Sequence, residues 1–166
     1  MRNPLLIAVL VSVISFQATY ARLGETDSQL ISRYGPIVST KEVNGLPLLT
    51  FEANGFIFQF SMIDGVAESI SVNKRDELFT PQEVQELLDR NKSGKGEWLQ
   101  KEVDEKNFSI SFYGPNGEIA KYDAKNKLIM IITKKFLQQA AVNLNRQKEK
   151  ERELEESAAK KALQGF

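Results

Sequence analysis

The chain has 166 residues, and 22 basic residues balance 22 acidic residues. It contains no histidine and no cysteine, which excludes disulfide bonds, lipid attachment to an amino-terminal cysteine, Cys/His zinc sites and histidine-based catalysis. A neutral chain of this length also lacks the strongly basic character of nucleic-acid-binding proteins and fits one compact domain.

The first residues have the pattern of a secretion signal. Arg2 precedes an uncharged apolar run from Leu5 to Phe16, and small residues stand before a cleavage site after Ala21. The run is too short to span a bilayer, which needs about 20 residues. We therefore expect residues 1–21 to be a signal peptide, with no transmembrane segment after its removal. The mature protein is expected to be exported to the periplasm or the extracellular space.

Residues 22–76 are predicted to form a helix followed by an antiparallel meander. Thr26 and Gln29 have capping-box spacing at the start of the helix, and Gly35-Pro36 ends it. Asn-Gly and Asp-Gly dipeptides are typical of tight hairpin turns, because both central residues of such turns need a positive φ. They occur here at Asn44-Gly45, Asn54-Gly55 and Asp64-Gly65, and the strands expected around them are 46–53, 56–63 and 66–73.

The meander alternates imperfectly between apolar and polar residues, as a half-buried sheet does. The expected inward side chains are Phe56, Phe58, Phe60 and Met62 in one strand, and Val66, Ile70 and Val72 in the next, where Glu68 is an exception. The expected outward side chains, which should face water, are Gln59, Ser61, Ser69 and Ser71. One face of the sheet should therefore pack against helices.

Residues 77–135 repeat this order. Thr80, Pro81 and Glu83 have the spacing of a capped helix start, and a polar loop from Asn91 to Gly96 follows that helix. Trp98 is expected to open a short strand. The later expectations are strand 107–113 with Phe108, Ile110 and Phe112 on one face, a hairpin turn at Asn116-Gly117, and strands 118–123 and 128–133.

Residues 136–166 are predicted to form a charged C-terminal helix. Phe136, Leu137, Ala140, Ala141 and Leu144 would share one side of its first turns. The segment 146–161 is dense in charges of both signs, which is typical of a solvated helix. The stripe of Leu154, Ala158 and Ala162 is too thin for a coiled coil by itself. We expect the first turns to pack and the remainder to project into solvent.

The expected fold class is therefore α+β. Two helix-plus-antiparallel-meander repeats, 22–76 and 77–135, would form a two-layer sandwich with helices on one face, and the charged helix would end the chain. The alternative is that two unrelated α+β segments only look alike.

The first unit resembles the SmpA/BamE-like family of small outer-membrane assembly factors. The resemblance covers residues 24–72 and rests on Gly24, Thr26, Gln29, Leu30, Tyr34 and Gly35, with Phe60 and Asp64-Gly65 further on. Pro36 falls one position early for the family pattern. Duplication of such a unit is similar to beta-lactamase inhibitor proteins, which build one concave sheet from two repeats. The resemblance implies a fold and a bias toward protein binding. The chain departs from both groups because it has no cysteine for lipidation or disulfides.

No residue set points to catalysis, a cofactor or a metal. The loop Asn91–Gly96 lacks the strand-to-helix context of a phosphate-binding loop. The strand carboxylates Glu52, Glu68, Glu102 and Glu118 are more typical of solvated sheet charges than of a two-carboxylate hydrolase. Trp98 and Tyr113, each beside a glycine-containing loop, are the candidate partner surface. Asn91 and Asn107 match the glycosylation sequon.

These observations predict an exported, non-enzymatic protein-interaction module of the cell envelope or extracellular space. Its partner would be another envelope or extracellular protein, and nucleic acid is not expected. One alternative is a secreted enzyme inhibitor of the two-repeat type, with the loop Asn91–Gly96 entering its target. The other is a hydrolase that uses carboxylates.

Overall fold

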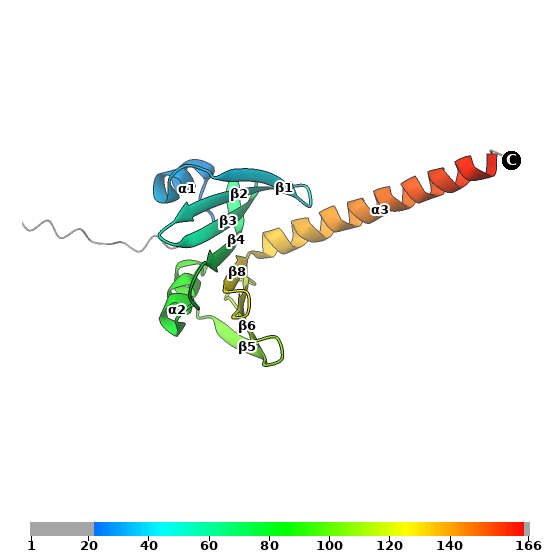
Figure 1. Ribbon diagram of the computed structural model, residues 1–166. Coiled ribbons are helices and arrows are strands. Elements are labelled where there is room, and N and C mark those ends of the chain that lie inside the picture. Colours follow the sequence, from blue (N-terminus) through cyan, green and yellow to red (C-terminus); the bar gives the residue numbers. More distant parts are fainter. Residues whose placement is uncertain (1–21, 165–166) are drawn as a thin grey trace, which may run out of the picture.

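The computed structural model describes residues 22–164, and the expected signal peptide lies outside this range. The chain forms three helices and eight strands there (Figure 1). The helices are α1 (Asp27–Tyr34), α2 (Pro81–Arg90) and α3 (Lys134–Gln164). The strands are β1 (Ser39–Val43), β2 (Leu46–Ala53), β3 (Phe56–Ile63), β4 (Val66–Lys74), β5 (Leu99–Asp104), β6 (Ser109–Tyr113), β7 (Ile119–Asp123) and β8 (Leu128–Ile132). The expected α+β class is confirmed.

All eight strands belong to one antiparallel sheet, in the order β1-β2-β3-β4-β8-β7-β6-β5. Helix α1 leads into β1–β4, and α2 leads into β5–β8. The two meanders meet where β4 pairs with β8, so β1 and β5 are the edge strands. Helices α1 and α2 lie to one side of the sheet, and α3 leaves on the other (Figure 1).

Both short helices begin as the sequence predicts. The hydroxyl of Thr26 accepts a hydrogen bond from the Gln29 backbone N–H, and the Gln29 side chain accepts from the Thr26 N–H. Thr80 and Glu83 form the same reciprocal pair at α2, with Pro81 at the first helical position. These capping boxes satisfy backbone donors that the first turn of a helix leaves without partners.

The first three hairpin turns also form where they are predicted. Asn44, Asn54 and Asp64 have φ values of 52–53°, and the glycine after each has a positive φ. The first turn joins β1 to β2, and β1 is a strand that is absent from the sequence predictions. Four of the five side chains of β1 are exposed, so it has no buried alternation by which to recognise it.

The turn expected at Asn116-Gly117 is instead a longer loop between β6 and β7. The Gly114 N–H donates to the Glu118 carbonyl at 2.8 Å, and within the loop Gly117, but not Asn116, has a positive φ. Pro115 fixes its own φ near −65°, a value that fits an ordinary turn rather than the tight hairpin form.

The core lies between the sheet and the two short helices. In the first half of the sheet, the Tyr34 ring of α1 packs on Phe51, Phe58 and Phe60, with ring centroids 4.6–5.7 Å apart. The core side chains around α2 are Val84, Leu87 and Leu88 from the helix and Ala120, Ile129 and Ile131 from the sheet. The aromatic contacts continue from Phe58 through Phe56 and Phe79 to Tyr122 in the second half.

A β-bulge explains the exceptional position of Glu68. The register between β3 and β4 shifts after Ser61, which pairs with Ser69, so that Met62 pairs with Ala67 and Glu68 is the extra residue. Ala67, with no exposed surface, therefore shares the buried face with Ile70 and Val72, and the expectation for Val66 is wrong. Ser69, expected to face water, is buried at 6% exposure.

The bulge also anchors α3. The hydroxyl of Thr133 donates to Glu68 Oε2 at 2.6 Å and accepts from the Phe136 N–H at 3.0 Å. Thr133 is thus the helix cap rather than the last residue of a strand. Lys135 Nζ lies 2.8 Å from Asp64 Oδ2, and Asn143 Nδ2 donates to the Asn44 carbonyl at 2.7 Å.

Beyond Asn143, whose side chain is the second hydrogen-bonded tie between α3 and the sheet after Thr133, α3 extends away from the body (Figure 1). Phe136 and Ala140 are half-buried, whereas Leu137 is exposed, and every side chain from Leu144 to Lys161 is exposed. Within residues 22–164 no helix combines the length and the apolar character needed to cross a membrane.

Candidate interaction surface

Two turns of the second meander, which connect β5 to β6 and β7 to β8, are built in the same way. In the β5–β6 turn, the Asp104 carboxylate accepts from the Asn107 backbone N–H at 3.1 Å and from its side-chain amide at 2.6 Å. In the β7–β8 turn, Asp123 accepts the same two bonds from Asn126 at 3.0 and 2.7 Å. These hydrogen bonds stabilise the charged form and lower the pKa of both aspartates.

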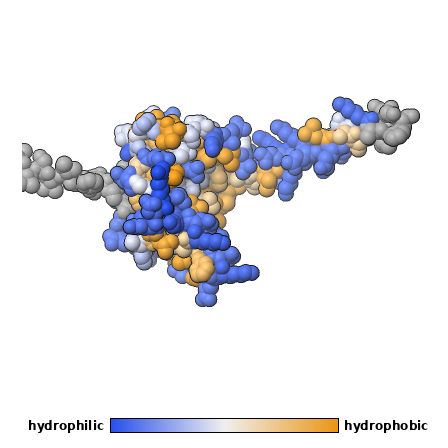
Figure 2. Space-filling model, viewed as in Figure 1, coloured by the Kyte–Doolittle hydropathy of each residue, from blue (hydrophilic) through white to orange (hydrophobic). Residues whose placement is uncertain are grey.

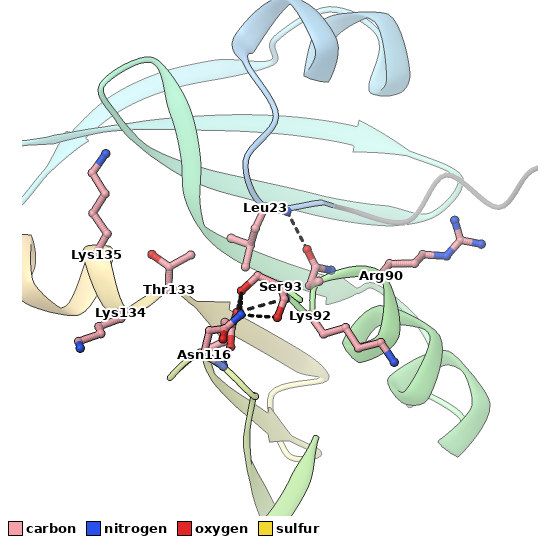
Figure 3. Close-up of a pocket in the computed structure, with 10 residues that line it drawn as sticks. Leu23, Arg90, Lys92, Ser93, Asn116, Thr133, Lys134 and Lys135 are labelled. Atoms are coloured by element: carbon pink, nitrogen blue, oxygen red, sulfur yellow. Dashed lines mark hydrogen bonds between the residues drawn. The ribbon is translucent and has the colours of Figure 1, made fainter. Parts of the chain in front are cut away.

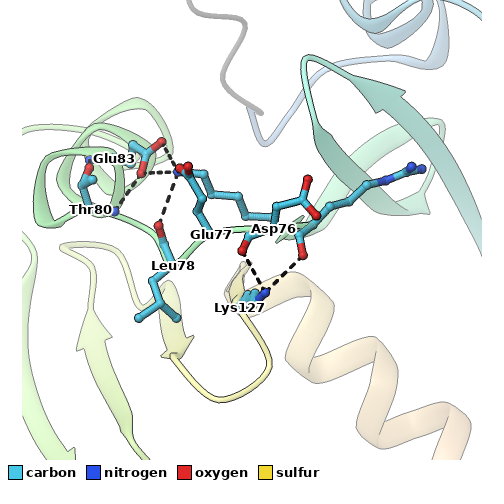
Figure 4. A network of polar contacts seen from close by, with 8 residues as sticks. Asp76, Glu77, Leu78, Thr80, Glu83 and Lys127 are labelled. Carbon is cyan, nitrogen blue, oxygen red and sulfur yellow. Dashed lines mark hydrogen bonds and ion pairs between the residues drawn. The ribbon is translucent and has the colours of Figure 1, made fainter.

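The residue after the asparagine has a left-handed backbone in each turn, and the two side chains differ. Lys127 has φ 51°, and its ammonium donates to the carbonyls of Arg75 and Asp76 at 3.2 and 3.1 Å (Figure 4). Phe108 has φ 52° and a side chain that is 65% exposed. This backbone conformation costs roughly 1–2 kcal/mol for a residue with a Cβ. A large aromatic side chain is therefore held in a strained position where it faces solvent.

The position of Phe108 corrects a sequence prediction. It was expected to share a strand face with Ile110 and Phe112, but β6 begins at Ser109 and Phe108 belongs to the turn. Ile110 and Phe112 are half-buried in β6. Repetition of the pattern Asp-x-x-Asn at 104–107 and 123–126 is the sequence signal that identifies the turn.

Two open hollows lie on either side of Phe108. One has a volume of about 560 Å³ and is lined by Val103, Ile110 and Tyr122 as well as Phe108. The other, of about 450 Å³, lies between Phe108 and Leu78. Phe108 and Ala124 line both hollows, so the two are adjacent. We name Leu78, Val103, Phe108, Ile110 and Tyr122 the Phe108 surface.

The Phe108 surface exists because the apolar face of the sheet extends further than its helical cover. One row of cross-strand neighbours runs across the sheet through Phe58, Val72, Ile129, Tyr122, Ile110 and Val103. Phe58, Val72 and Ile129 are at most 3% exposed, whereas Val103 on edge strand β5 is 56% exposed. Figure 2 shows apolar residues exposed at this end of the body, around the β5–β6 hairpin.

Charges of opposite sign flank the Phe108 surface. Asp104 and Glu105 line the hollow beside Val103, and Lys106 and Lys125 line the hollow beside Leu78. Leu78 and Phe108 are 56% and 65% exposed. The surface is therefore apolar at its centre, acidic at one end and basic at the other. This composition is typical of a protein contact, in which an apolar centre is surrounded by polar residues.

A buried carboxylate holds the loops at the other end of the second meander. Glu118 is 3% exposed, and its carboxylate accepts from the Ser93 hydroxyl and backbone N–H and from the Asn116 N–H. Burial by itself raises the pKa of Glu118, but these hydrogen bonds outweigh it and the net pKa is lowered. A Cβ on Gly114 would lie 2.6 Å from Glu118 Oε2, so a side chain there would force the carboxylate or the loop to move.

Trp98 and Asn91 join this loop region to α2. The Trp98 indole is half-buried and donates to the Leu88 carbonyl at 2.7 Å. Asn91 is 4% exposed, donates to the Leu87 carbonyl at 2.8 Å and accepts from the Leu23 N–H at 2.7 Å. Of the two sequon asparagines, only Asn107 is exposed. Tyr113 is 36% exposed at the end of β6 and does not line the Phe108 surface.

A polar hollow of about 230 Å³ lies between the loop after α2 and the start of α3 (Figure 3). Its cations include Lys92, 3.3 Å from Asp89, and Lys135, which also faces Asp64 and Glu68. Carboxylates of the chain thus already neutralise much of its positive charge, and it is a weaker candidate site than the Phe108 surface.

The carboxylates considered for hydrolysis have separate environments. Glu52 pairs with Arg75 at 2.5 Å, Glu68 binds Thr133, and Glu102 is exposed on β5. The buried Glu118 carboxylate accepts hydrogen bonds from Ser93 and Asn116. Within residues 22–164, no group of three or more acidic residues is placed to hold a metal ion.

No protein-family model matches the chain, and no curated protein matches it. Among solved structures, it is similar to a cysteine-rich secretory protein from Staphylococcus aureus, with 15% sequence identity and a TM-score of 0.43. The match covers 69% of this chain and 46% of that protein, so the chain spans about half the length of this relative. A likeness of this degree says nothing about what the chain binds.

Proposed function

We propose that the chain is an exported, non-enzymatic protein-interaction module of the cell envelope or extracellular space, and that the Phe108 surface is its contact. The observation that carries the proposal is the conformation of Phe108. Residues held in unfavourable backbone regions persist where the surroundings impose them, and they gather at functional sites.

Folding alone does not explain a phenylalanine at this position. The turn needs a left-handed residue after Asn107, and asparagine or glycine adopts that conformation at lower cost. In the sister turn, Lys127 is tied to two backbone carbonyls. Phe108 instead exposes most of its ring between two hollows. Burial of such a side chain in a complex contributes about 1.5–3 kcal/mol of apolar stabilisation.

The partner class follows from composition and export. The signal-like segment 1–21 supports a partner in the envelope or the extracellular space, and a chain with balanced charge does not favour nucleic acid. Tyr113 remains a second candidate contact. Trp98 is half-buried and hydrogen-bonded, so its role in a partner surface stays a prediction.

The proposed origin of the module is duplication of one helix-plus-meander unit, packed as a two-layer sandwich. Each unit begins with a threonine capping box and continues into four antiparallel strands. The first strands share a sequence as well, Lys41-Glu42-Val43 in β1 and Lys101-Glu102-Val103 in β5. Under this proposal, the Phe108 surface belongs to the second copy.

Site-specific photo-crosslinking in the exporting cell tests the contact. A photoreactive phenylalanine analogue at position 108 should give a discrete protein adduct, because the native ring would lie within the interface. The matched control is the same analogue at Val38, which is 56% exposed at the other end of the sheet. Equal adducts from both positions, or no adduct from position 108, would contradict the proposal.

The enzyme-inhibitor alternative stays a prediction about the loop 91–96. Both Asn91 and Ser93 are bound to the body of the protein. Nothing in their arrangement favours insertion into a target.

A further inference from the structure

We infer that the projecting part of α3 from a second copy of this chain is the partner of the Phe108 surface. The inference rests on the proposed function, which it makes specific by naming the partner. It is carried by a match in apolar and charged residues between two surfaces that are both exposed in the single chain.

The first surface is the Phe108 surface, read from end to end. Asp104 and Glu105 lie at the end beside Val103, Phe108 stands at the centre, and Lys106 and Lys125 lie at the far end. An occupant that fits must carry a positive charge at one end and a negative charge at the other. Between them it needs apolar side chains that enter the hollows on either side of a protruding ring.

The second surface is one face of α3. Glu151, Leu154, Ala158 and Lys161 follow one another at spacings of three and four residues, which places them on a single side of a helix. All four side chains are exposed, Leu154 to 70%. From amino to carboxyl end this face reads acidic, apolar, apolar, basic. The face is about 15 Å long, from the rise of 1.5 Å per helical residue.

The two surfaces are complementary in the order of their charged and apolar residues. Lys161 would face Glu105, and Glu151 would face Lys106 and Lys125. The small side chain of Ala158 leaves room for the Phe108 ring, and the larger Leu154 would enter a hollow beside it. Each contact removes apolar surface from water, and the opposite charges fix the direction of the helix.

The geometry favours a helix from another chain. Thr133 and Asn143 tie α3 to Glu68 and Asn44, and α3 leaves the sheet on the side opposite α1 and α2 (Figure 1). The hollows lie on the helix-covered side, beside Tyr122 and Val103. A straight helix held at both ties therefore points away from its own hollows. Contact between unlike surfaces of two copies either closes as a reciprocal pair or continues as an open chain.

The exposure of the projecting part of α3 also supports docking on a second copy of the chain. From Leu144 to Lys161 every side chain is exposed, so tertiary packing does not stabilise this segment. Helices in proteins owe most of their stability to the packing of an apolar face. Docking on the Phe108 surface would provide the packing that the single chain does not.

Sedimentation velocity of the full exported chain at increasing concentration tests the inference. We expect a monomer at low concentration and dimers or longer assemblies at high concentration. Phe108→Ser and Leu154→Ser should each weaken association by about tenfold or more. The matched control is Val142→Ser, which removes an exposed apolar residue from a different side of α3 and should leave association unchanged.

A charge exchange tests the direction of the helix. Lys161→Glu should weaken association by placing like charges together, and Glu105→Lys in the same chain should restore it. Lys160→Glu, which changes the neighbouring lysine on another face, should have little effect. Failure of Glu105→Lys to restore association would overturn the inferred pairing.

The inference and the proposed function fail separately. A chain that stays monomeric at all concentrations overturns the inference, as does association that is indifferent to Phe108→Ser and Leu154→Ser. If such a chain still forms an adduct with a different protein through position 108, the proposed function stands. An adduct of two copies joined between position 108 and the α3 segment 151–161 supports both.

Discussion

The two halves of the sheet share one plan of a capped helix and four strands, yet their apolar residues are placed differently. In the first half, Tyr34, Phe51, Phe58 and Phe60 form a buried aromatic cluster under α1. In the second half, the largest exposed apolar side chain of the turns is Phe108, and a polar network around Glu118 holds the loops. The first half thus encloses its aromatic side chains in the core, while the second half leaves apolar surface exposed, and this exposed surface is the proposed contact.

Removal of a ring from the aromatic cluster should have the largest effect. Phe60 has no exposed surface and packs on Phe51 with centroids 5.7 Å apart. Phe60→Ala should lower the free energy of unfolding by about 3–5 kcal/mol through lost burial and a residual cavity. Urea denaturation of Phe60→Ala and Phe108→Ala measures the contrast. Equal losses would show that Phe108 contributes to the core.

Filling the space at Gly114 should have the next largest effect. The new Cβ would meet Glu118 Oε2 at 2.6 Å and the Trp98 ring at 3.2 Å, so the loop network must move. We expect Gly114→Ala to cost about 2–3 kcal/mol. Gly55→Ala is the control, because a Cβ on Gly55 would meet no atom within 4 Å, although the residue has a positive φ of 80°. Its strain alone should cost about 1 kcal/mol. Thermal unfolding compares the two variants, and a smaller loss at Gly114 would contradict this account.

Replacement of Glu118 should weaken the second half in a pH-dependent way. Glu118→Gln removes the charge that accepts from Ser93 and Asn116, and puts an amide donor against other donors. We expect a loss of about 2 kcal/mol at neutral pH. Because the folded pKa is lowered, the stabilisation is present above the ordinary carboxyl pKa and is lost as pH falls through the folded value.

The difference between wild type and Glu118→Gln should therefore shrink as pH is lowered below about 4. Denaturation measured across this range tests it. The exposed Glu102→Gln variant should show no comparable loss at any pH, and a constant difference for Glu118→Gln would rule out the carboxylate as the cause.

The smallest expected effect is a gain in stability, and its size should differ between the β5–β6 and β7–β8 turns. Phe108→Asn should stabilise the free chain by about 1 kcal/mol or less, because asparagine tolerates a left-handed backbone and little packing is lost. Lys127→Asn should gain less, because it also removes the bonds to Arg75 and Asp76. Differential scanning calorimetry compares them. Destabilisation by Phe108→Asn would mean that the ring supports folding rather than binding.

Local signals in the sequence identify the elements that local chemistry determines. Thr26 and Thr80 cap helices through atoms three residues away, and the Asn-Gly and Asp-Gly turns depend on their own two backbone conformations. Strand β1 was missed because an exposed edge strand buries no alternate residues. Glu68 was recognised as an exception, but its bulge depends on pairing with β3 and is not encoded in β4 alone.

The alternation of apolar and polar residues in the sequence does not predict the Phe108 surface. Phe108, Ile110 and Phe112 alternate as in one strand, and this pattern hides the turn that Asp104 and Asn107 form. The sequence predicts Trp98 and Tyr113 as contacts because they are aromatic residues beside loops, and the structure packs Trp98 against α2. Neither the exposure of Phe108 nor the open end of the apolar row can be read from one strand, because both depend on where α2 stops covering the sheet.

Two backbone hydrogen bonds at the start of β4 have a mechanical consequence. The Gly24 N–H donates to the Ala67 carbonyl, and the Thr133 N–H donates to the carbonyl of the adjacent Glu68. The entry of the folded body and the base of α3 are thus fastened to neighbouring residues. Tension applied between the amino terminus and the tip of α3 would pass through this short segment and leave most of the sheet unloaded. Such a force would therefore act on the first residues of β4 and the end of β8, and not directly on β5 and β6, which carry most of the Phe108 surface.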